Sequence, residues 1–133
     1  GQLCAASYFD TLDTPGNRAF KLRVDGWNGA PRRVSSVFAS AFTAVNLCIA
    51  AIEASSTDEP RRVRREVLDH SWPTLFGDMV IDPNSNHAAL PFHLGRINGD
   101  NGFDVIASRP ALAADPYLTG GTRREPPKLR VIS

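Results

Sequence analysis

The sequence predicts an α/β fold in which helices are followed by an antiparallel β segment. Apolar residues recur at intervals of three and four between Val37 and Ile52, which is the spacing of an amphipathic helix. After His70 the pattern changes to alternation with a period of two, which is typical of strands. Asn and Gly residues gather between Asn98 and Gly102, where a hairpin turn joining two such strands needs them.

The composition is that of an ordinary globular domain. The chain has 133 residues, 42% of them hydrophobic and 22% charged, which is enough for one domain. Its net charge of +1 gives no electrostatic reason to expect nucleic acid as a partner. The apolar stretch Val37 to Ile52 is interrupted by polar residues and is expected to fall short of a bilayer span. No signal peptide is visible, and because the chain begins with Gly1 rather than methionine, we expect its natural amino terminus to lie upstream or to have been removed.

The first elements are predicted to be a strand and a capped helix. Leu3 to Phe9 is a short apolar run, which we expect to form a buried strand. Thr14 suits the cap of a following helix, and Pro15 suits its first position because the missing N–H would be unpaired there anyway. This helix is expected to end between Gly26 and Gly29.

The helix from about Ser36 to Ser55 is predicted to be the most buried element. Its apolar spacing and Ala-rich flanks indicate that neighbours approach it closely on several sides. A third helix is expected to open at Ser56, with Glu59 completing a capping box. In the core of the long helix we expect Phe38, Phe42, Val45 and Ile49.

The second half is predicted to contain three strands and an extended tail. The strands are expected over Leu75–Ile81, His87–Ile97 and Phe103–Ser108, with the last two forming an antiparallel hairpin. A turn is expected over residues 83–86. We therefore divide the chain into a body over residues 1–108 and a Pro-containing extended tail over residues 109–133.

The residues that often carry chemistry favour structural interpretations here. Cys4 and Cys48 are expected to be reduced packing residues, because they offer neither a metal spacing nor a redox pair. His87 and His93 share a strand face, with Asp82 and Asp104 as possible further ligands, but their side chains would lie about 13 Å apart, too far to share one ion. No metal site and no cofactor are expected.

The aromatic and basic residues likewise favour packing and solvation over ligand binding. Trp27 and Trp72 are interpreted as caps on a core edge rather than as ligand platforms. The basic run at residues 61–65 is interpreted as a solvated helix face rather than a phosphate site. No Gly-x-Ser-x-Gly elbow, Cys–His signature or Gly-rich phosphate loop occurs in the sequence, so an enzyme is not expected.

Several short segments occur in an order that points to one protein family. They are Ala6-Ser7-Tyr8-Phe9, Asp13-Thr14-Pro15, Arg18-Ala19-Phe20, the helix Val37–Ala54, Asn86-His87-Ala88-Ala89-Leu90, Arg96-Ile97 and Asp115-Pro116-Tyr117. In this order they resemble the leucine–isoleucine–valine receptor group of type I periplasmic binding proteins. The resemblance covers residues 1 to about 120, and the closest likeness is to the amide-sensing branch, which includes the negative regulator of the aliphatic amidase operon.

The resemblance implies a partial flavodoxin-like lobe of a non-catalytic receptor for a small amide, urea or amino-acid-like ligand. Ser7 and Tyr8 would lie at the hinge or the pocket edge, and most other ligand contacts would lie upstream. The partners implied are the missing upstream lobe or another chain, together with an RNA-binding antitermination regulator or an ABC permease. The amide-sensing branch implies a cytoplasmic protein, and the transport branch a periplasmic or extracellular one. The alternative is a structural or oligomerisation fragment without ligand affinity. Because a partial lobe exposes apolar surface, self-association or a covering chain is also expected.

Overall fold

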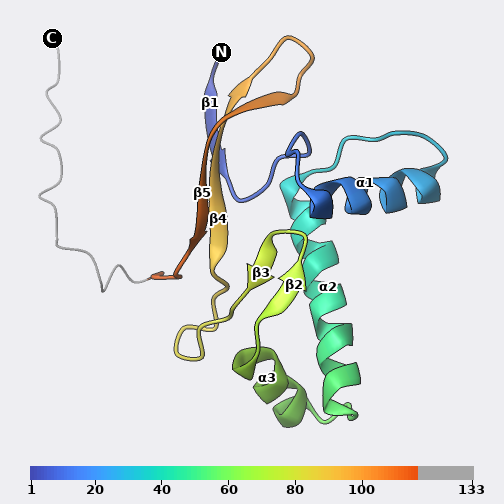
Figure 1. Cartoon of the computed structure of the whole chain (residues 1–133), viewed down its shortest axis with the longest axis vertical. Coiled ribbons are helices and arrows are strands. Elements are labelled where there is room, and N and C mark those ends of the chain that lie inside the picture. The colour runs from blue at the N-terminus through green and yellow to red at the C-terminus, as the bar shows by residue number, and fades with distance from the viewer. Residues whose placement is uncertain (117–133) are drawn as a thin grey trace, which may run out of the picture.

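The computed structural model describes residues 1–116, which form three helices, a three-stranded sheet and a small two-stranded hairpin (Figure 1). Both described sheets are antiparallel, so the predicted α/β class with an antiparallel β segment is confirmed. The elements in chain order are β1 (Leu3–Ala6), α1 (Pro15–Asn28), α2 (Ser36–Ser55), α3 (Pro60–Asp69), β2 (Trp72–Thr74), β3 (Gly77–Met79), β4 (Leu90–Ile97) and β5 (Phe103–Leu112).

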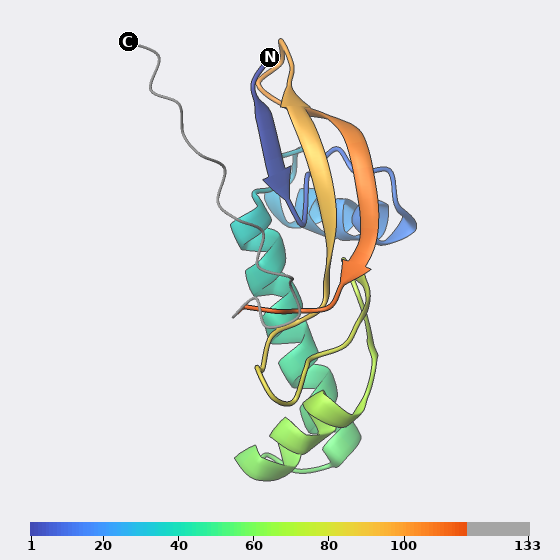
Figure 2. The same ribbon diagram turned by 90° about the vertical axis from the view of Figure 1, so that its left-hand side faces the viewer.

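The larger sheet joins the two ends of the described chain. Its strand order is β1-β4-β5, with Leu3 opposite Arg96 and His93 opposite Ser108. The amino terminus therefore lies beside the tip of the β4–β5 hairpin, while α2 extends away from the sheet toward α3 (Figure 2). The loop between β1 and α1 leaves the sheet at Ser7 and carries the chain to the helical side.

Local signals set the bounds of α1 as the sequence predicts. Thr14 is the N-cap, and its hydroxyl accepts a hydrogen bond from the backbone N–H of Asn17. Pro15 occupies the first helical position, where its missing N–H costs nothing. Gly29 ends the helix with a φ of 69°, a left-handed conformation that glycine adopts without strain.

The prediction that α2 is the most buried element is wrong. Its buried residues are Ala39, Thr43 and Ala51, whereas Val45 is 59% exposed and Ile49 50% exposed. Phe38 is also exposed and Phe42 is only partly buried. The apolar residues surround much of the helix, and the described chain packs against only part of that circumference. The core lies instead around Tyr8, Phe20, Val24, Val34 and Ala39.

By length and composition alone, α2 would be able to cross a membrane, contrary to the sequence-based expectation. Only 17% of its most apolar window is buried within the described residues.

Cys48 is likewise exposed rather than packed, and Cys4 is half-buried in β1; both thiols are free. Trp27 is mostly exposed, with the guanidinium of Arg23 lying over its ring.

The junction between α2 and α3 differs from the predicted capping box. Ser56 ends α2 in a left-handed conformation, with a φ of 51°, and so does not open the next helix. Glu59 is the N-cap of α3, and its carboxylate accepts hydrogen bonds from the backbone N–H groups of Arg61 and Arg62. Val63 is buried on the inner side of α3, while the arginines at residues 61, 62, 64 and 65 are exposed, as predicted for a solvated face.

The strand expected over Leu75–Ile81 is only partly present: Leu75 and Phe76 form the turn of a tight hairpin, and Gly77–Met79 is its second strand. β2 and β3 pair antiparallel, and Gly77, with a φ of 96°, opens the second strand. The turn expected over residues 83–86 is present, because the Asp82 carboxylate accepts hydrogen bonds from the backbone of Asn84 and from the backbone and hydroxyl of Ser85.

The predicted β4–β5 hairpin is confirmed. The side chain of Asn98 closes its turn by accepting a hydrogen bond from the backbone of Gly102. β5 continues past the expected end at Ser108 to Leu112, which pairs with Leu90 of β4. Residues 117–133 of the expected tail lie outside the described residues.

Candidate functional site

Tyr8, one of the two expected site residues, belongs to the core. It is 2% exposed, and its ring packs edge-on against Phe20 and Phe76. Its hydroxyl donates a hydrogen bond of 2.8 Å to Oδ1 of Asn17. Burial and the nearby Asp10 raise the pKa of Tyr8 to about 12, so the hydroxyl stays protonated. The hydroxyl of Tyr8 is therefore already engaged by Asn17.

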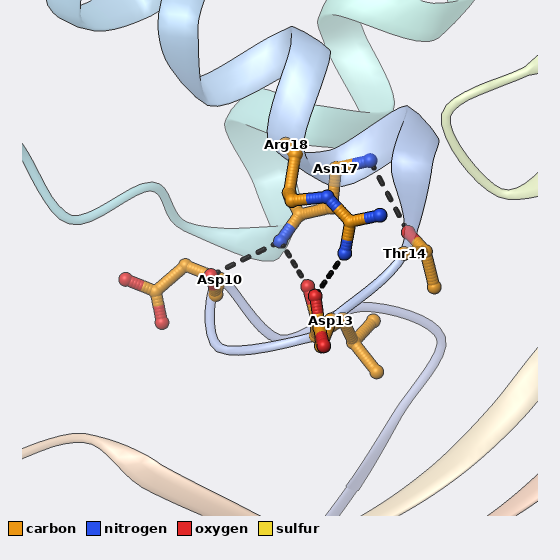
Figure 3. Close-up of polar contacts among 6 residues, drawn as sticks. Asp10, Asp13, Thr14, Asn17 and Arg18 are labelled. Carbon is orange, nitrogen blue, oxygen red and sulfur yellow. Dashed lines mark hydrogen bonds and ion pairs between the residues drawn. The ribbon is translucent and has the colours of Figure 1, made fainter.

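Asn17 fixes the loop that carries Ser7 and Tyr8 away from the sheet. Its amide nitrogen donates to the backbone carbonyls of Asp10, at 3.1 Å, and Leu12, at 2.7 Å. Its own backbone N–H is capped by Thr14, as Figure 3 shows. Since Asn17 is itself buried, the loop between β1 and α1 is tied to the first turn of α1 by bonds shielded from water.

Ser7 and Tyr8 both line a pocket of about 260 Å³, which we call the β1-end pocket. It lies where the end of β1, the start of α1, the β2–β3 hairpin and β4 meet. The lining within the described residues includes no Asp, Glu, Lys or Arg side chain. The polar side chains in the lining, besides that of Tyr8, are Ser7, Thr14, Thr74 and His93.

His93 is a polar group of this pocket that sequence reasoning considered only as a metal ligand. It is largely buried in β4, and its Nδ1 lies 2.8 Å from the hydroxyl oxygen of Ser108 on β5. Burial lowers the pKa of His93, so the neutral imidazole is favoured. A neutral ring offers one donor and one acceptor nitrogen. His93 also lines a second hollow of about 650 Å³ beside Asp13 and Asp104.

The contact between Ser108 and His93 places a hydroxyl beside an imidazole. Nucleophilic catalysis needs the base to be oriented by a third group. Among residues 1–116, no carboxylate hydrogen bonds to His93. Its side chain and that of His87 also belong to no group of three potential metal ligands in this part of the chain.

A larger hollow lies on the helical side, which we call the α2–α3 groove. Its volume is about 690 Å³, and almost all of its lining is apolar. At its floor, Thr43 is 5% exposed and its hydroxyl has no hydrogen-bond partner among the described residues. The walls are formed by α2, α3, β3 and the segment leading into β4, and include Ala44, Leu47, Cys48, Val63, Met79 and Leu90.

Comparisons with known proteins relate this chain to solute-binding proteins. The family described as "Periplasmic binding protein domain" matches residues 1–123. The solved solute-binding protein of an ABC transporter from Rhodopseudomonas palustris HaA2, in complex with p-hydroxybenzoic acid, is 24% identical with a TM-score of 0.71. That match covers 85% of this chain and 32% of the solved chain.

A second solved structure is the branched-chain amino acid ABC transporter periplasmic ligand-binding protein from Burkholderia xenovorans LB400. It is 20% identical with a TM-score of 0.71, and the match covers 84% of this chain and 31% of that one. A curated relative named limonene hydroxylase, from Geobacillus stearothermophilus, is 26% identical over 120 residues, which are 90% of this chain and 22% of that protein. This chain thus spans about a third of these solved relatives and about a fifth of the curated one.

Proposed function

The chain belongs to the periplasmic binding protein domain family, and we propose that it forms the carboxy-terminal part of a non-catalytic receptor for a small organic solute. One observation carries this proposal: 85% of the chain follows the fold of a solute-binding protein while covering only 32% of it. Such receptors close by a hinge around their ligand, which requires the whole domain. The receptor in this proposal is this chain assembled with the upstream part of the domain, and we call it the assembled receptor.

The solute proposed for the assembled receptor carries an uncharged polar group, as an amide or urea does. The β1-end pocket offers hydroxyls from Ser7 and Thr14 and a neutral imidazole from His93. These groups hydrogen bond to an amide, but they do not neutralise a carboxylate. A solute that bears a carboxylate, such as an amino acid or the hydroxybenzoate of the relative, would need its cationic partner from the upstream part.

The partner proposed for the receptor is an ABC permease, with the receptor in the periplasm. Both solved relatives described above belong to ABC transporters by their names, which supports the transport branch. The amide-sensing branch, with a cytoplasmic receptor and an antitermination regulator, has no comparable support among them. The enzyme name of the curated relative does not alter the proposal, because the match covers only 22% of that protein.

Calorimetric titration of the assembled receptor tests the proposal with three probes: acetamide, leucine and 4-hydroxybenzoate. We expect saturable binding at one site, with acetamide preferred. Ser7→Ala should weaken that binding by about tenfold, which corresponds to the loss of one hydrogen bond. Ser71→Ala is the matched control, since Ser71 is exposed between α3 and β2 and does not line the pocket. A folded assembled receptor that binds none of the probes would favour a structural or oligomerisation fragment instead.

A further inference from the structure

Within the described residues, His93 is the side chain of the β1-end pocket that can gain a positive charge near neutral pH. The lining contributed by these residues has no Lys or Arg, and its ionisable groups are Tyr8 and His93. Tyr8 is neutral, because burial and Asp10 raise the pKa of its hydroxyl to about 12. An imidazole becomes a cation when it binds a proton. Any positive charge that this part of the pocket offers a solute therefore comes from a proton on His93.

The contacts of His93 suit both the neutral and the protonated ring. The side chain is 9% exposed, and its Nδ1 lies 2.8 Å from the hydroxyl oxygen of Ser108. A hydroxyl can donate or accept, so Ser108 pairs with Nδ1 whether or not that nitrogen carries a proton. Nε2 has no hydrogen-bond partner among residues 1–116. The second ring nitrogen is therefore left for a solute, and it is a donor when the ring is protonated.

The charged groups that face His93 from neighbouring elements are two carboxylates. Asp13 of the loop before α1 and Asp104 of β5 line the second hollow beside it, while β1 places an uncharged alanine opposite it. Both carboxylates are exposed; Asp13 is paired with Arg18, and Asp104 accepts a hydrogen bond of 2.9 Å from Asn98. Water screens these two charges, whereas burial lowers the pKa of His93, so the ring is neutral while the pocket holds no anion.

A solute with a carboxylate changes this balance. Beside a neutral ring, the carboxylate would leave water as an unpaired charge, which is costly. An opposite charge within hydrogen-bond reach raises the pKa of a histidine. His93 therefore takes a proton from the solvent as the carboxylate binds, and the two groups form a neutral pair joined by a charge-assisted hydrogen bond. An amide carries no charge, and it binds the neutral ring without this step.

We propose that the β1-end pocket binds carboxylate solutes together with one proton, which His93 carries, and binds amide solutes without a proton. The proposal rests on the proposed function and extends its solute class. The cationic partner that a carboxylate needs is then supplied by His93 of this chain, and the upstream part need not provide it. Acidic pH therefore favours carboxylates in this pocket relative to amides.

Calorimetric titration of the assembled receptor with acetamide and acetate tests the proposal. These two probes have nearly the same shape and differ in charge. Titrations in buffers of different ionisation enthalpy count the protons that are taken up on binding. We expect uptake of about one proton per acetate near pH 7 and none per acetamide. The affinity for acetate should rise by about tenfold for each pH unit below about pH 8, until His93 is already protonated in the empty receptor.

A histidine substitution identifies the group that carries the proton. His93→Gln keeps a polar side chain beside Ser108 but cannot take up a proton. It should abolish the proton uptake and weaken acetate relative to acetamide by about tenfold or more. His87→Gln is the matched control, because His87 is exposed and lines neither of the hollows that His93 lines. Circular dichroism of both variants checks that they fold.

A measurement on the unchanged sequence covers the case in which His93→Gln does not fold. This chain contains three histidines, so isotope-labelled histidine in it, combined with the unlabelled upstream part, gives three titrating signals by nuclear magnetic resonance. The signals of His70 and His87 are assigned through their own glutamine variants. Acetate should raise the pKa of His93 alone, and acetamide should leave all three unchanged.

Three outcomes would overturn the inference. The first is acetate binding without proton uptake, and the second is proton uptake that persists in His93→Gln, which would place the proton on an upstream group. The third is a receptor that binds acetamide but no acetate at any pH between about 5.5 and 8. Failure of the proposed function is distinguishable, because it appears as a folded assembled receptor that binds neither probe.

Discussion

Removing the hydroxyl of Tyr8 should destabilise the chain, because it leaves a buried acceptor without its donor. Tyr8 and Asn17 are each 2% exposed, and their hydrogen bond measures 2.8 Å. In Tyr8→Phe the ring still fills its place against Phe20 and Phe76, so little packing is lost. The cost is therefore that of an unpaired amide oxygen, about 1–3 kcal/mol in the free energy of unfolding.

Truncating Asn17, the acceptor in this hydrogen bond, should lower the free energy of unfolding by more than Tyr8→Phe does. Asn17→Ala removes the acceptor for Tyr8 and both donors to the carbonyls of Asp10 and Leu12. We expect a loss of about 3 kcal/mol or more, because three groups lose their partner at once. The double variant should lose less than the sum of the two single losses, with a coupling energy of about 1–2 kcal/mol.

The same hydroxyl should give the stability a dependence on alkaline pH. The pKa of Tyr8 rises from 10.0 to about 12 in the folded chain, so folding favours the protonated form. Its stabilising contribution is fully present below pH 10, the unfolded value, and is lost as the pH rises toward 12. Tyr8→Phe should remove this part of the alkaline loss.

Urea denaturation followed by tryptophan fluorescence measures these differences. The matched control is Thr11→Val, in which an exposed hydroxyl loses its 2.7 Å bond to the carbonyl of Phe103, at a cost of about 0.5 kcal/mol. The reasoning would be refuted if Tyr8→Phe lowered the free energy of unfolding by no more than Thr11→Val does. The Tyr8–Asn17 hydrogen bond would then not be what holds the loop after β1 in place.

Four further substitutions, one of them combined with a pH titration, test other parts of the structure by the same urea assay. Thr43→Val should stabilise the isolated chain by about 1 kcal/mol, because it removes a buried hydroxyl that lacks a partner among the described residues. Gly95→Ala should cost about 1–3 kcal/mol, since its new methyl group would lie 2.8 Å from the Phe9 ring. Gly26→Ala, which meets nothing within 4 Å in α1, should stabilise by up to about 1 kcal/mol. Because burial lowers the pKa of His93 below 6.5, stability should fall as the pH drops below that value, and His93→Gln should reduce the fall.

Features determined by short-range chemistry were predictable from the sequence. Thr14, Pro15 and Gly29 bound α1 where the capping rules place the ends of a helix. The β4–β5 hairpin follows from Asn98 and the glycines around it, because their side chains and backbones close the turn within five residues. These elements depend on neighbours in the chain and not on what packs against them.

Burial was not predictable, because periodicity does not show which sides of a helix are covered. The spacing in α2 is real, yet Val45 and Ile49 face away from the described chain.

Ser56 shows a second limit: a serine between two helices suits either the end of one or the start of the next, and here it ends α2. In the β2–β3 segment, Gly77 has a positive φ, and a glycine at this place in the sequence could have indicated the turn that the predicted strand left out.

The candidate site was predictable only in part. The resemblance drew attention to Ser7 and Tyr8, and both line the β1-end pocket. The hydrogen bond from the Tyr8 hydroxyl to Asn17 joins residues nine positions apart, and no local sequence pattern predicts it. The pairing of His93 with Ser108 could have been predicted from the sequence, because a hairpin centred near Asp100 places the two residues almost opposite each other.

The central claim, that this chain supplies one part of a two-part solute site, is tested most directly by calorimetric titration of the purified 133-residue chain alone. The titrants are acetamide, urea and leucine. The account predicts no saturable heat, because a pocket open on one side makes few contacts with a small polar solute, and few contacts give little binding free energy. Saturable binding at micromolar ligand, with one site per chain, would contradict it and would make this chain a self-sufficient receptor.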